Sequence, residues 1–340
     1  MRQNRAAVLT DREEITIMDW PMPACGSDQV VIEVAACGVC GSDMHFFHHG
    51  RIGSLIVTAP LVLGHEASGT IVEAGENVDP SRLGQRVAIE PQMTCGTCAS
   101  CLSGRQNLCP DVRYFSAFPV HGAFQRYVSI PSPLAHPLPE TESFEAGGLM
   151  EPVSVVLWAA ERARIMAGDR VLITGAGPIG NLAVQIARLN GAVEITAVDI
   201  VRSRLDYALS VGASAVCENS NNGLTDLDRD FDVLIECTGH PATVSEALLH
   251  VRPAGRAVLV GMAPTETQQM PLPAIQVREI EISGTFRFAN CYLRAIRIAA
   301  SGRLMLDEIV NARFTLDETS AALSSPRTNA ATLKPMVYPD

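Results

Sequence analysis

The chain has 340 residues, of which 47% are hydrophobic and 19% charged, and its formal net charge at pH 7 is −11. This length and composition favour a compact protein of two domains and exclude a disordered chain. The acidic balance disfavours nucleic acid and anionic membranes as partners.

The sequence favours a cytoplasmic location. Acidic residues interrupt the N-terminal stretch MRQNRAAVLTDREE before any apolar run of signal-peptide length. No segment approaches the roughly 18 apolar residues of a membrane span, so no membrane association is expected. Thiols stay reduced in the cytoplasm, where clustered cysteines are more often metal ligands than disulfides.

The first 150 residues are rich in Gly and Pro and contain short β-type runs, such as VVIEVAA (30–36) and RVAIEP (86–91). Short strands separated by turn residues predict an irregular, barrel-like β domain.

From about residue 153, strands alternate with helices. The expected strands cover residues 170–175, 194–200, 231–239, 256–262 and 279–286, and the expected helices cover 178–191, 202–212 and 241–251. This alternation predicts a doubly wound parallel sheet, and therefore an α/β domain. The tail from residue 291 begins with a helix, and it could return to the first domain. We expect one domain from residues 1–152 with 291–340 and a second from 153–290.

A glycine-rich turn follows the first strand of the second domain. Gly175, Gly177 and Gly180 form a G-x-G-x-x-G motif that opens a helix. The first glycine allows a tight turn, the second lets the backbone approach a pyrophosphate, and the third lets helix and strand pack closely. Asp199 ends the next strand, where a carboxylate accepts ribose hydroxyls and disfavours a 2′-phosphate. The pattern therefore predicts NAD rather than NADP, although a purely structural glycine turn is the alternative.

Two arginines qualify that preference. Arg202 and Arg204 lie just beyond Asp199 and could soften the choice of NAD over NADP. For Arg202, a solvated position at the start of a helix is an equally good interpretation.

Four cysteines lie close together within an expected lobe at residues 91–112. Their spacing is C-x2-C-x2-C-x7-C, at Cys95, Cys98, Cys101 and Cys109. Four thiolates from one short loop can complete a closed tetrahedral zinc site, with an iron–sulfur cluster as the main alternative. A closed site has no position for a substrate, so this lobe is expected to be structural.

A second group of candidate ligands is dispersed along the chain. Cys40, His65 and Glu66, with Glu151 in an apolar setting, would leave an open zinc position of the kind that catalysis needs. Each residue also has a plain structural interpretation. We expect Cys37, Cys217 and Cys237 to be buried small residues. His48 and His49 are not counted as ligands, because adjacent residues of a loop rarely both point inward.

The motifs together resemble one family. GHEASGTIVEAGENV (64–78) fits the zinc alcohol dehydrogenase signature G-H-E-x2-G-x5-G-x2-V at every position. CGVCGSD, the four-cysteine lobe and GAGPIG follow in the same order as in the zinc-dependent medium-chain alcohol dehydrogenases. GVCGSDMHFFHHG, MEPVSV and GTFRFANCY (284–292) are most similar to the sorbitol (polyol) dehydrogenase branch. The resemblance implies a GroES-like β-barrel catalytic domain, a Rossmann domain and an active site in the cleft between them.

The resemblance also implies roles for individual residues. Cys40, His65 and Glu66 would bind the catalytic zinc, and Glu151 would reach it directly or through water. Ser42 and His45 would relay the alcohol proton, with Glu151 as the alternative. Besides Glu151, the polyol would contact Phe46, Arg287 and Phe288. Animal members of the branch carry tyrosines at the positions of Phe46 and Phe288. Besides the three motif glycines, NAD would contact Pro178, Ile179, Asp199, Arg204, Val260, Gly261, Met262, Phe286 and Arg287.

The predicted activity is reversible, NAD-dependent oxidation of a secondary alcohol in a polyol such as sorbitol, xylitol or galactitol to a ketose. We expect one catalytic and one structural zinc ion per chain and a homo-oligomer, either a dimer or a tetramer. One alternative is a related zinc dehydrogenase acting on L-threonine or a sugar acid such as L-idonate, for which Arg287 is the obvious cation. Another is a non-catalytic NAD-binding protein.

Overall fold

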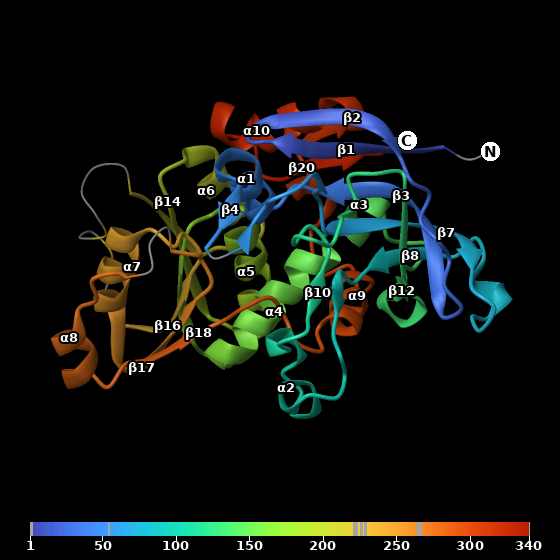
Figure 1. Cartoon of the computed structure of the whole chain (residues 1–340). Helices are drawn as coiled ribbons and strands as arrows, with labels where there is room; N and C mark the ends of the chain where they lie inside the picture. The colour runs from blue at the N-terminus through green and yellow to red at the C-terminus, as the bar shows by residue number, and fades with distance from the viewer. Residues whose placement is uncertain are drawn as a thin grey trace. The chain divides into compact units, whose positions relative to one another are not determined.

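Two units divide the chain in the computed structural model, which describes residues 3–53, 55–219, 224, 227, 230–263 and 267–339. Unit 1 comprises Met1–Glu151 and Tyr292–Asp340, and unit 2 comprises Pro152–Cys291 (Figure 1). The tail thus belongs to the first unit. The functional domains expected at 1–152 with 291–340 and at 153–290 stay a prediction.

Unit 1 is built around the long strand β3 (Gln29–Gly38). It pairs antiparallel with β7 (Glu66–Ala74), β11 (Tyr127–Pro131) and β20 (Pro335–Tyr338). Three further strands complete this seven-stranded sheet: β8 (Arg86–Ile89), β12 (Ala135–Pro137) and β19 (Ala312–Thr315). A second sheet contains β1 (Asn4–Asp11), β2 (Glu14–Trp20) and β6 (Leu61–Val62). The short pairs are β4 (Arg51–Ile52) with β5 (Leu55–Ile56) and β9 (Gln92–Met93) with β10 (Arg113–Tyr114).

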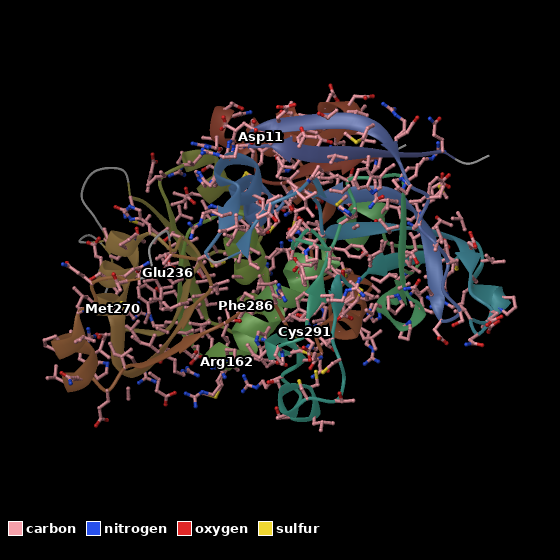
Figure 2. The ribbon with its side chains drawn as sticks, in the orientation of Figure 1. Asp11, Arg162, Glu236, Met270, Phe286 and Cys291 are labelled. Atoms are coloured by element: carbon pink, nitrogen blue, oxygen red, sulfur yellow. The ribbon has the colours of Figure 1, made fainter. Side chains whose placement is uncertain are left out.

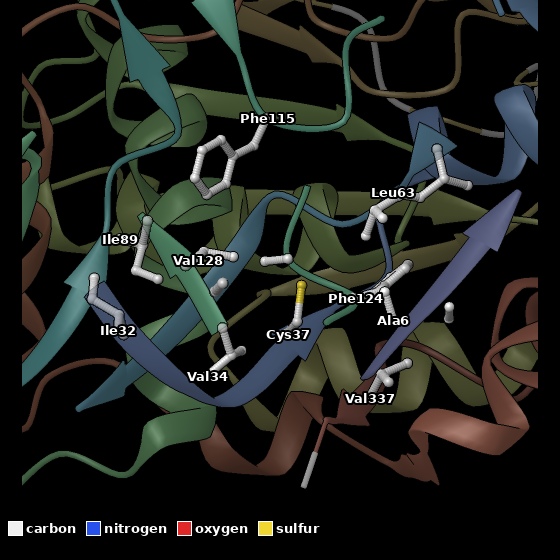
Figure 3. Close-up of a cluster of buried hydrophobic side chains, with 14 of the residues drawn as sticks. Ala6, Ile32, Val34, Cys37, Leu63, Ile89, Phe115, Phe124, Val128 and Val337 are labelled. Carbon is white, nitrogen blue, oxygen red and sulfur yellow. The ribbon is translucent and has the colours of Figure 1, made fainter. Parts of the chain in front are cut away.

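The strands of unit 1 enclose a common hydrophobic core. Figure 3 shows side chains from distant strands and loops meeting there, among them Ala6, Ile32, Leu63, Phe124 and Val337. All five are 0% exposed. Val337 comes from β20, so the tail contributes apolar surface to the core as well as hydrogen bonds to β3.

The helices of unit 1 are short. They are α1 (Gly41–His49), α2 (Ala99–Leu102), α3 (Phe144–Gly148), α9 (Tyr292–Ala299) and α10 (Thr319–Thr328). The helix α4 (Met150–Ala163) carries the chain from unit 1 into unit 2.

The described residues of unit 2 form one parallel sheet of six strands, in the order β15-β14-β13-β16-β17-β18. The strands are β13 (Arg170–Thr174), β14 (Glu194–Asp199), β15 (Ala215–Glu218), β16 (Phe231–Glu236), β17 (Val251–Leu259) and β18 (Glu281–Gly284). The helices are α5 (Pro178–Leu189), α6 (Arg202–Ser210), α7 (Pro241–Ala247) and α8 (Leu272–Val277). The order reverses between β13 and β16. Because crossovers between parallel strands are right-handed, the reversal sends successive helices to opposite faces, as in a Rossmann fold.

The predicted α/β class is therefore confirmed, with some boundaries moved. The strand expected at 256–262 begins earlier, at Val251, and the helix expected to end at 251 stops at Ala247. The start of that strand is not recognisable in the sequence, because it contains Pro253 and Gly255, which are typical of loops. The edge strand β15 and the helix α8 had no clear signal in the sequence.

Among the described residues, no helix combines the length and the apolar character needed to cross a membrane.

Candidate metal centres and dinucleotide site

The dispersed ligands Cys40, His65 and Glu66 meet in unit 1. One ligand atom from each lies within 4.8 Å of the others. The sheet explains this convergence: Gly38 at the end of β3 pairs with Glu66 at the start of β7. Cys40 follows β3 as the N-cap of α1, and His65 immediately precedes β7. A thiolate, an imidazole and a carboxylate at these separations fit a divalent ion of the zinc type with an open position.

Asp43 faces His65. The Asp43 side chain is 0% exposed, and its Oδ1 lies 3.4 Å from His65 Nδ1. Its carboxylate also accepts hydrogen bonds from the backbone N–H groups of Cys40 and Gly64, both at 3.1 Å. With Nδ1 facing Asp43, the Nε2 atom of His65 is left for a metal. Burial opposes a charge on His65, but Asp43 and Cys40 outweigh burial and raise the pKa of His65 well above its usual value.

Glu66 faces a buried ammonium group. The Glu66 carboxylate forms an ion pair with Lys334, and these residues are only 1% and 2% exposed. Lys334 Nζ also donates a hydrogen bond to the backbone oxygen of Val39 at 3.0 Å. Burial disfavours the ammonium, but Glu66 and Cys40 outweigh burial and raise the pKa of Lys334. A Cβ atom at Gly38 would lie 2.2 Å from Glu66 Oε2, so glycine there makes room for the carboxylate.

Glu151 lies outside this three-residue cluster. It is 4% exposed, and its Oε1 accepts a hydrogen bond of 2.6 Å from the Tyr114 hydroxyl. The Tyr114 ring in turn packs beside the His65 ring, with 5.5 Å between centroids. Burial raises the pKa of Glu151. Its predicted place in the metal site, direct or through water, stays a prediction.

The expected proton relay lies on α1. Ser42 Oγ is 3.5 Å from His65 Nε2, and His45 is exposed one turn further along the helix. Partial burial, His49 and His48 together lower the pKa of His45. The expectation that His48 and His49 lie on a loop is wrong, because both belong to α1. His48 is buried and bonds through Nδ1 to Glu13 at 2.8 Å, whereas His49 is exposed.

The four clustered cysteines form a second candidate metal site. Their sulfur atoms all lie within 4.8 Å of one another, with Cys95 Sγ 3.5 Å from Cys109 Sγ and 4.0 Å from Cys101 Sγ. Thiolates at about 2.3 Å from a tetrahedral zinc ion would be about 3.8 Å apart. Backbone N–H groups of Thr97 and Cys98 lower the pKa of Cys95 to about 6, which favours the thiolate. All ten cysteines lie in the described chain and are free. The site therefore fits one closed ion.

The glycine-rich turn adopts the geometry that its spacing predicts. Gly175 has a φ of +85°, and a Cβ atom at Gly180 would lie 1.7 Å from the Gly175 oxygen. A Cβ atom at Gly177 would meet nothing within 4 Å, which leaves that position open to a ligand. Gly177 is also the N-cap of α5, with Pro178 in the first turn before Ile179. The turn thus offers an approach for phosphate at a helix N-terminus.

Asp199 joins this turn to the start of α6 through its two carboxylate oxygens. Oδ2 accepts from the Ala176 N–H at 2.7 Å, and Oδ1 accepts from the Val201 N–H at 2.9 Å. Arg202 forms an exposed ion pair of 2.8 Å with Asp206, four residues along α6. This contact favours the interpretation of Arg202 as a solvated helix residue. Arg204 lies on the same helix.

Glu236 organises the backbone beside the glycine-rich turn. Glu236, labelled in Figure 2, is 0% exposed and accepts hydrogen bonds from the N–H groups of Thr238 at 2.8 Å and Gly239 at 3.0 Å. Its backbone oxygen accepts from the N–H groups of Val260 and Gly261, at 2.8 and 2.9 Å. The two predicted NAD contacts Val260 and Gly261 are therefore held at the end of β16, beside the glycine-rich turn.

The other predicted cofactor and substrate residues differ in exposure. Met262 and Phe286 are 61% and 46% exposed (Figure 2 labels Phe286), and the Arg287 guanidinium lies 4.8 Å from the centroid of the Phe286 ring. Phe46 is 4% exposed within the core of unit 1, and Phe288 is 0% exposed. The roles of Phe46, Arg287 and Phe288 toward a polyol stay predictions.

The isolated cysteines are only partly as expected. Cys37 is 0% exposed in the core of unit 1, as predicted. Cys217 and Cys237 are only partly buried, so the expectation that they are buried residues is not met for either. Cys217 lies on the edge strand β15, and Cys237 follows the end of β16, where a sheet covers side chains less completely.

Several residues around the metal site were missed at the level of sequence. Ser116 donates a hydrogen bond of 2.6 Å to Asp43, and Tyr114 and Lys334 bond to the acids described above. Lys334 stands out in the sequence only as its single lysine. A buried lysine needs a compensating charge, but the burial of Lys334 is seen only in the structure, so the sequence carried no signal for this role.

Comparisons with known proteins agree with this geometry. Residues 26–140 match the family model "Alcohol dehydrogenase GroES-like domain", and residues 178–301 match "Zinc-binding dehydrogenase". Sorbitol dehydrogenase of Bacillus subtilis (strain 168) is 38% identical over 343 residues, covering 99% of this chain and 97% of that relative.

Two solved structures are also similar. One, from Sinorhizobium meliloti 1021, assigned as a zinc-binding dehydrogenase and bound to NADP, has a TM-score of 0.93 at 31% identity and covers 100% of both chains. L-idonate 5-dehydrogenase of Escherichia coli has a TM-score of 0.90 at 28% identity, over 99% of this chain and 98% of its own.

Proposed function

Because this chain belongs to the zinc-dependent medium-chain alcohol dehydrogenases, in their sorbitol dehydrogenase branch, we propose that it reversibly oxidises a secondary alcohol of a polyol to a ketose with NAD. The observation that carries the proposal is the convergence of Cys40, His65 and Glu66 within 4.8 Å beside buried supporting charges. Sorbitol, xylitol and galactitol are the substrates to test first.

We assign a zinc ion to each cysteine-containing cluster. Cys40, His65 and Glu66 would hold the catalytic ion, with Glu151 beside them, and the four cysteines of the lobe would hold the structural ion. Bound zinc supplies Lewis-acid chemistry, which makes an alcohol hydroxyl easier to deprotonate. The lobe offers only its four sulfur ligands and no open position, so we assign it no chemistry.

The chain's own residues then position and move protons. Asp43 faces Nδ1 of His65 and would favour the tautomer that carries its proton there, which leaves Nε2 for the metal. Ser42, which is 3.5 Å from His65 Nε2, would pass the alcohol proton toward the exposed His45 and water. The pKa of His45 is lowered, so His45 is neutral near pH 7 and can accept this proton. Glu151 is the alternative acceptor.

We propose NAD as the coenzyme, which supplies the hydride acceptor. Asp199 at the end of β14 would accept the ribose hydroxyls, and a 2′-phosphate there would meet its negative charge. Gly175, Gly177 and Gly180 would admit the pyrophosphate at the N-terminus of α5. The similar structure bound to NADP makes this preference a point to measure, and Arg204 on α6 is the residue that could soften it.

Domain roles, assembly and location complete the proposal. Residues 1–152 with 291–340 would form the catalytic domain and 153–290 the NAD-binding domain. We propose a cytoplasmic homo-oligomer that takes a small polyol. The similarity to L-idonate 5-dehydrogenase keeps a sugar acid as the second candidate substrate, with Arg287 as the cation for its carboxylate.

A substrate panel tests the proposal. NADH formation is measured with sorbitol, xylitol, galactitol, L-threonine and L-idonate, each with NAD and with NADP. Turnover of one or more polyols with NAD is expected. Exclusive turnover of L-threonine or L-idonate would contradict the polyol assignment, and no turnover by the zinc-loaded protein would favour a non-catalytic role.

A further inference from the structure

The segment that leaves the four-cysteine lobe returns directly to the catalytic ligand set. We propose that Tyr114 and Ser116 are positioning residues through which the lobe holds the catalytic metal ligands in place. The inference rests on the metal assignments made under the proposed function. It gives the lobe a second role beyond that of a local structural site.

The lobe is closed by a short stem. Strand β9 enters the lobe and β10 leaves it, with Met93 opposite Arg113 and Gln92 opposite Tyr114. The Phe115 N–H extends this pairing by donating to the Pro91 oxygen at 3.2 Å. Because the four sulfur ligands lie between the two stem strands in sequence, an ion that gathers them also fixes the spacing of the stem.

Two side chains at the base of this stem bond to acids of the catalytic site. Tyr114 donates to Glu151 Oε1, and Ser116 donates to Asp43 Oδ1, both at 2.6 Å. Asp43 faces His65 Nδ1, and the Tyr114 ring packs beside the His65 ring. Tyr114 therefore contacts His65 directly through its ring, and Ser116 is linked to His65 through Asp43.

The segment from Tyr114 to Ser116 is buried in the core of unit 1. Phe115 is 4% exposed, and Figure 3 shows its ring among the buried side chains of unit 1. Tyr114 and Ser116 are 7% and 2% exposed. Ser116 has a φ of +65°, a left-handed conformation that persists only where surrounding contacts hold it. A buried segment held in this way transmits a displacement of the stem to both hydroxyl groups.

Loss of either hydroxyl should weaken the catalytic metal site. The acceptors are buried carboxylates, and hydrogen bonds to charged groups in a low-dielectric interior are strong. Partners that orient metal ligands typically account for a 10-fold to 100-fold change in metal affinity. A lobe that only stabilises its own loop would leave the affinity of the distant catalytic ion unchanged.

The first test measures metal affinity in the full-length, two-metal enzyme by competition with a zinc chelator. Tyr114→Phe and Ser116→Ala should each lower the affinity for the catalytic ion about 10-fold or more, without loss of the ion in the lobe. Ser129→Ala is the matched control, because the Ser129 hydroxyl bonds to Gln29 in the same unit at 3.1 Å. Parent-like affinity in both variants would overturn the proposal.

The second test perturbs the lobe without removing a ligand. Gly96 and Gly84 have φ values of +73° and +79°, and a Cβ atom at either would meet nothing within 4 Å. Alanine therefore introduces similar backbone strain at both positions, but only Gly96 lies in the lobe. Gly96→Ala should lower the affinity for the catalytic ion several-fold, and Gly84→Ala should leave that affinity unchanged. Equal effects of the two variants would overturn the coupling.

The third test asks whether the segment carries the coupling. In the Tyr114→Phe/Ser116→Ala background, Gly96→Ala should change the affinity of the catalytic ion by less than about twofold. An undiminished effect would show that the lobe acts by another route, against the proposal. These affinities do not depend on substrate, so failure of polyol turnover would contradict only the proposed function. A parent enzyme that holds no ion at Cys40 and His65 would contradict both.

Discussion

Replacement of the single lysine is the most informative perturbation of unit 1. Lys334→Met keeps most of the aliphatic part of the side chain and removes its charge. The Glu66 carboxylate, 1% exposed, then loses the ammonium that neutralises it, and the Val39 oxygen loses its 3.0 Å donor. An uncompensated buried charge is costly, whereas the same substitution at an exposed ion pair is not.

The expected magnitude follows from this burial. Breaking a buried ion pair from one side costs about 3–5 kcal/mol of the free energy of unfolding. For a unit of this size that corresponds to a fall in melting temperature of roughly 10 °C. The loss should be larger in metal-free protein than in zinc-loaded protein, because a divalent ion beside Glu66 replaces part of the missing positive charge.

The assay is thermal unfolding of parent and variants, stripped of metal and reloaded with zinc. Arg5→Met is the control, because Arg5 pairs with Asp317 at 2.7 Å on the surface, with side chains 40% and 61% exposed. The double variant Glu66→Gln/Lys334→Met should recover much of the loss, since it removes both charges. Metal-free Lys334→Met that melts together with the parent would refute the reasoning, as would a double variant no more stable than the single one.

Three further predictions concern unit 2. Asp199→Ala should weaken NADH binding about 10-fold relative to NADPH binding, measured by fluorescence titration, because the variant lacks the carboxylate that disfavours a 2′-phosphate. An unchanged ratio of the two dissociation constants would argue against this role of Asp199. Gly180→Ala should destabilise unit 2, since its Cβ atom would lie 1.7 Å from the Gly175 oxygen, whereas Gly177→Ala should melt normally and lose NAD affinity; similar melting of the two would contradict this. Burial raises the pKa of the Asp232 carboxyl, but hydrogen bonds from the Arg170 N–H and the Arg252 side chain outweigh burial and lower it. The stability that Asp232 contributes is therefore present above its unfolded pKa of about 4 and is lost as the pH falls through its folded pKa. Denaturant unfolding should therefore show the Asp232→Asn variant approaching parent stability in acid, and a constant difference from pH 7 to pH 3 would contradict the linkage.

Contiguous motifs were the part of the molecule that sequence predicted well. The turn Gly175–Gly180, the cysteines of the lobe and the buried strand at 170–174 each depend on neighbours a few residues away. Spacing alone carries such information, because a tight turn or a closed metal loop has local geometric requirements.

Contacts between distant segments were not predictable in this way. Lys334 bonds to Val39, 295 residues earlier, and only the pairing of β20 with β3 brings them together. Tyr114 and Ser116 have no motif, because their roles depend on where the stem of the lobe ends. The boundary of β17 was missed for the opposite reason: local loop-forming residues obscured a strand that tertiary pairing stabilises.

Zinc content and NADH formation, measured together on the parent and on Cys40→Ser, test the central claim most directly. The parent should hold two zinc ions per chain and reduce NAD with a polyol, one ion for each ligand cluster. Cys40→Ser should keep the lobe ion and NAD binding but lose the second ion and turnover. Full turnover by Cys40→Ser with a single zinc ion would contradict the assignment of catalysis to the Cys40, His65 and Glu66 site.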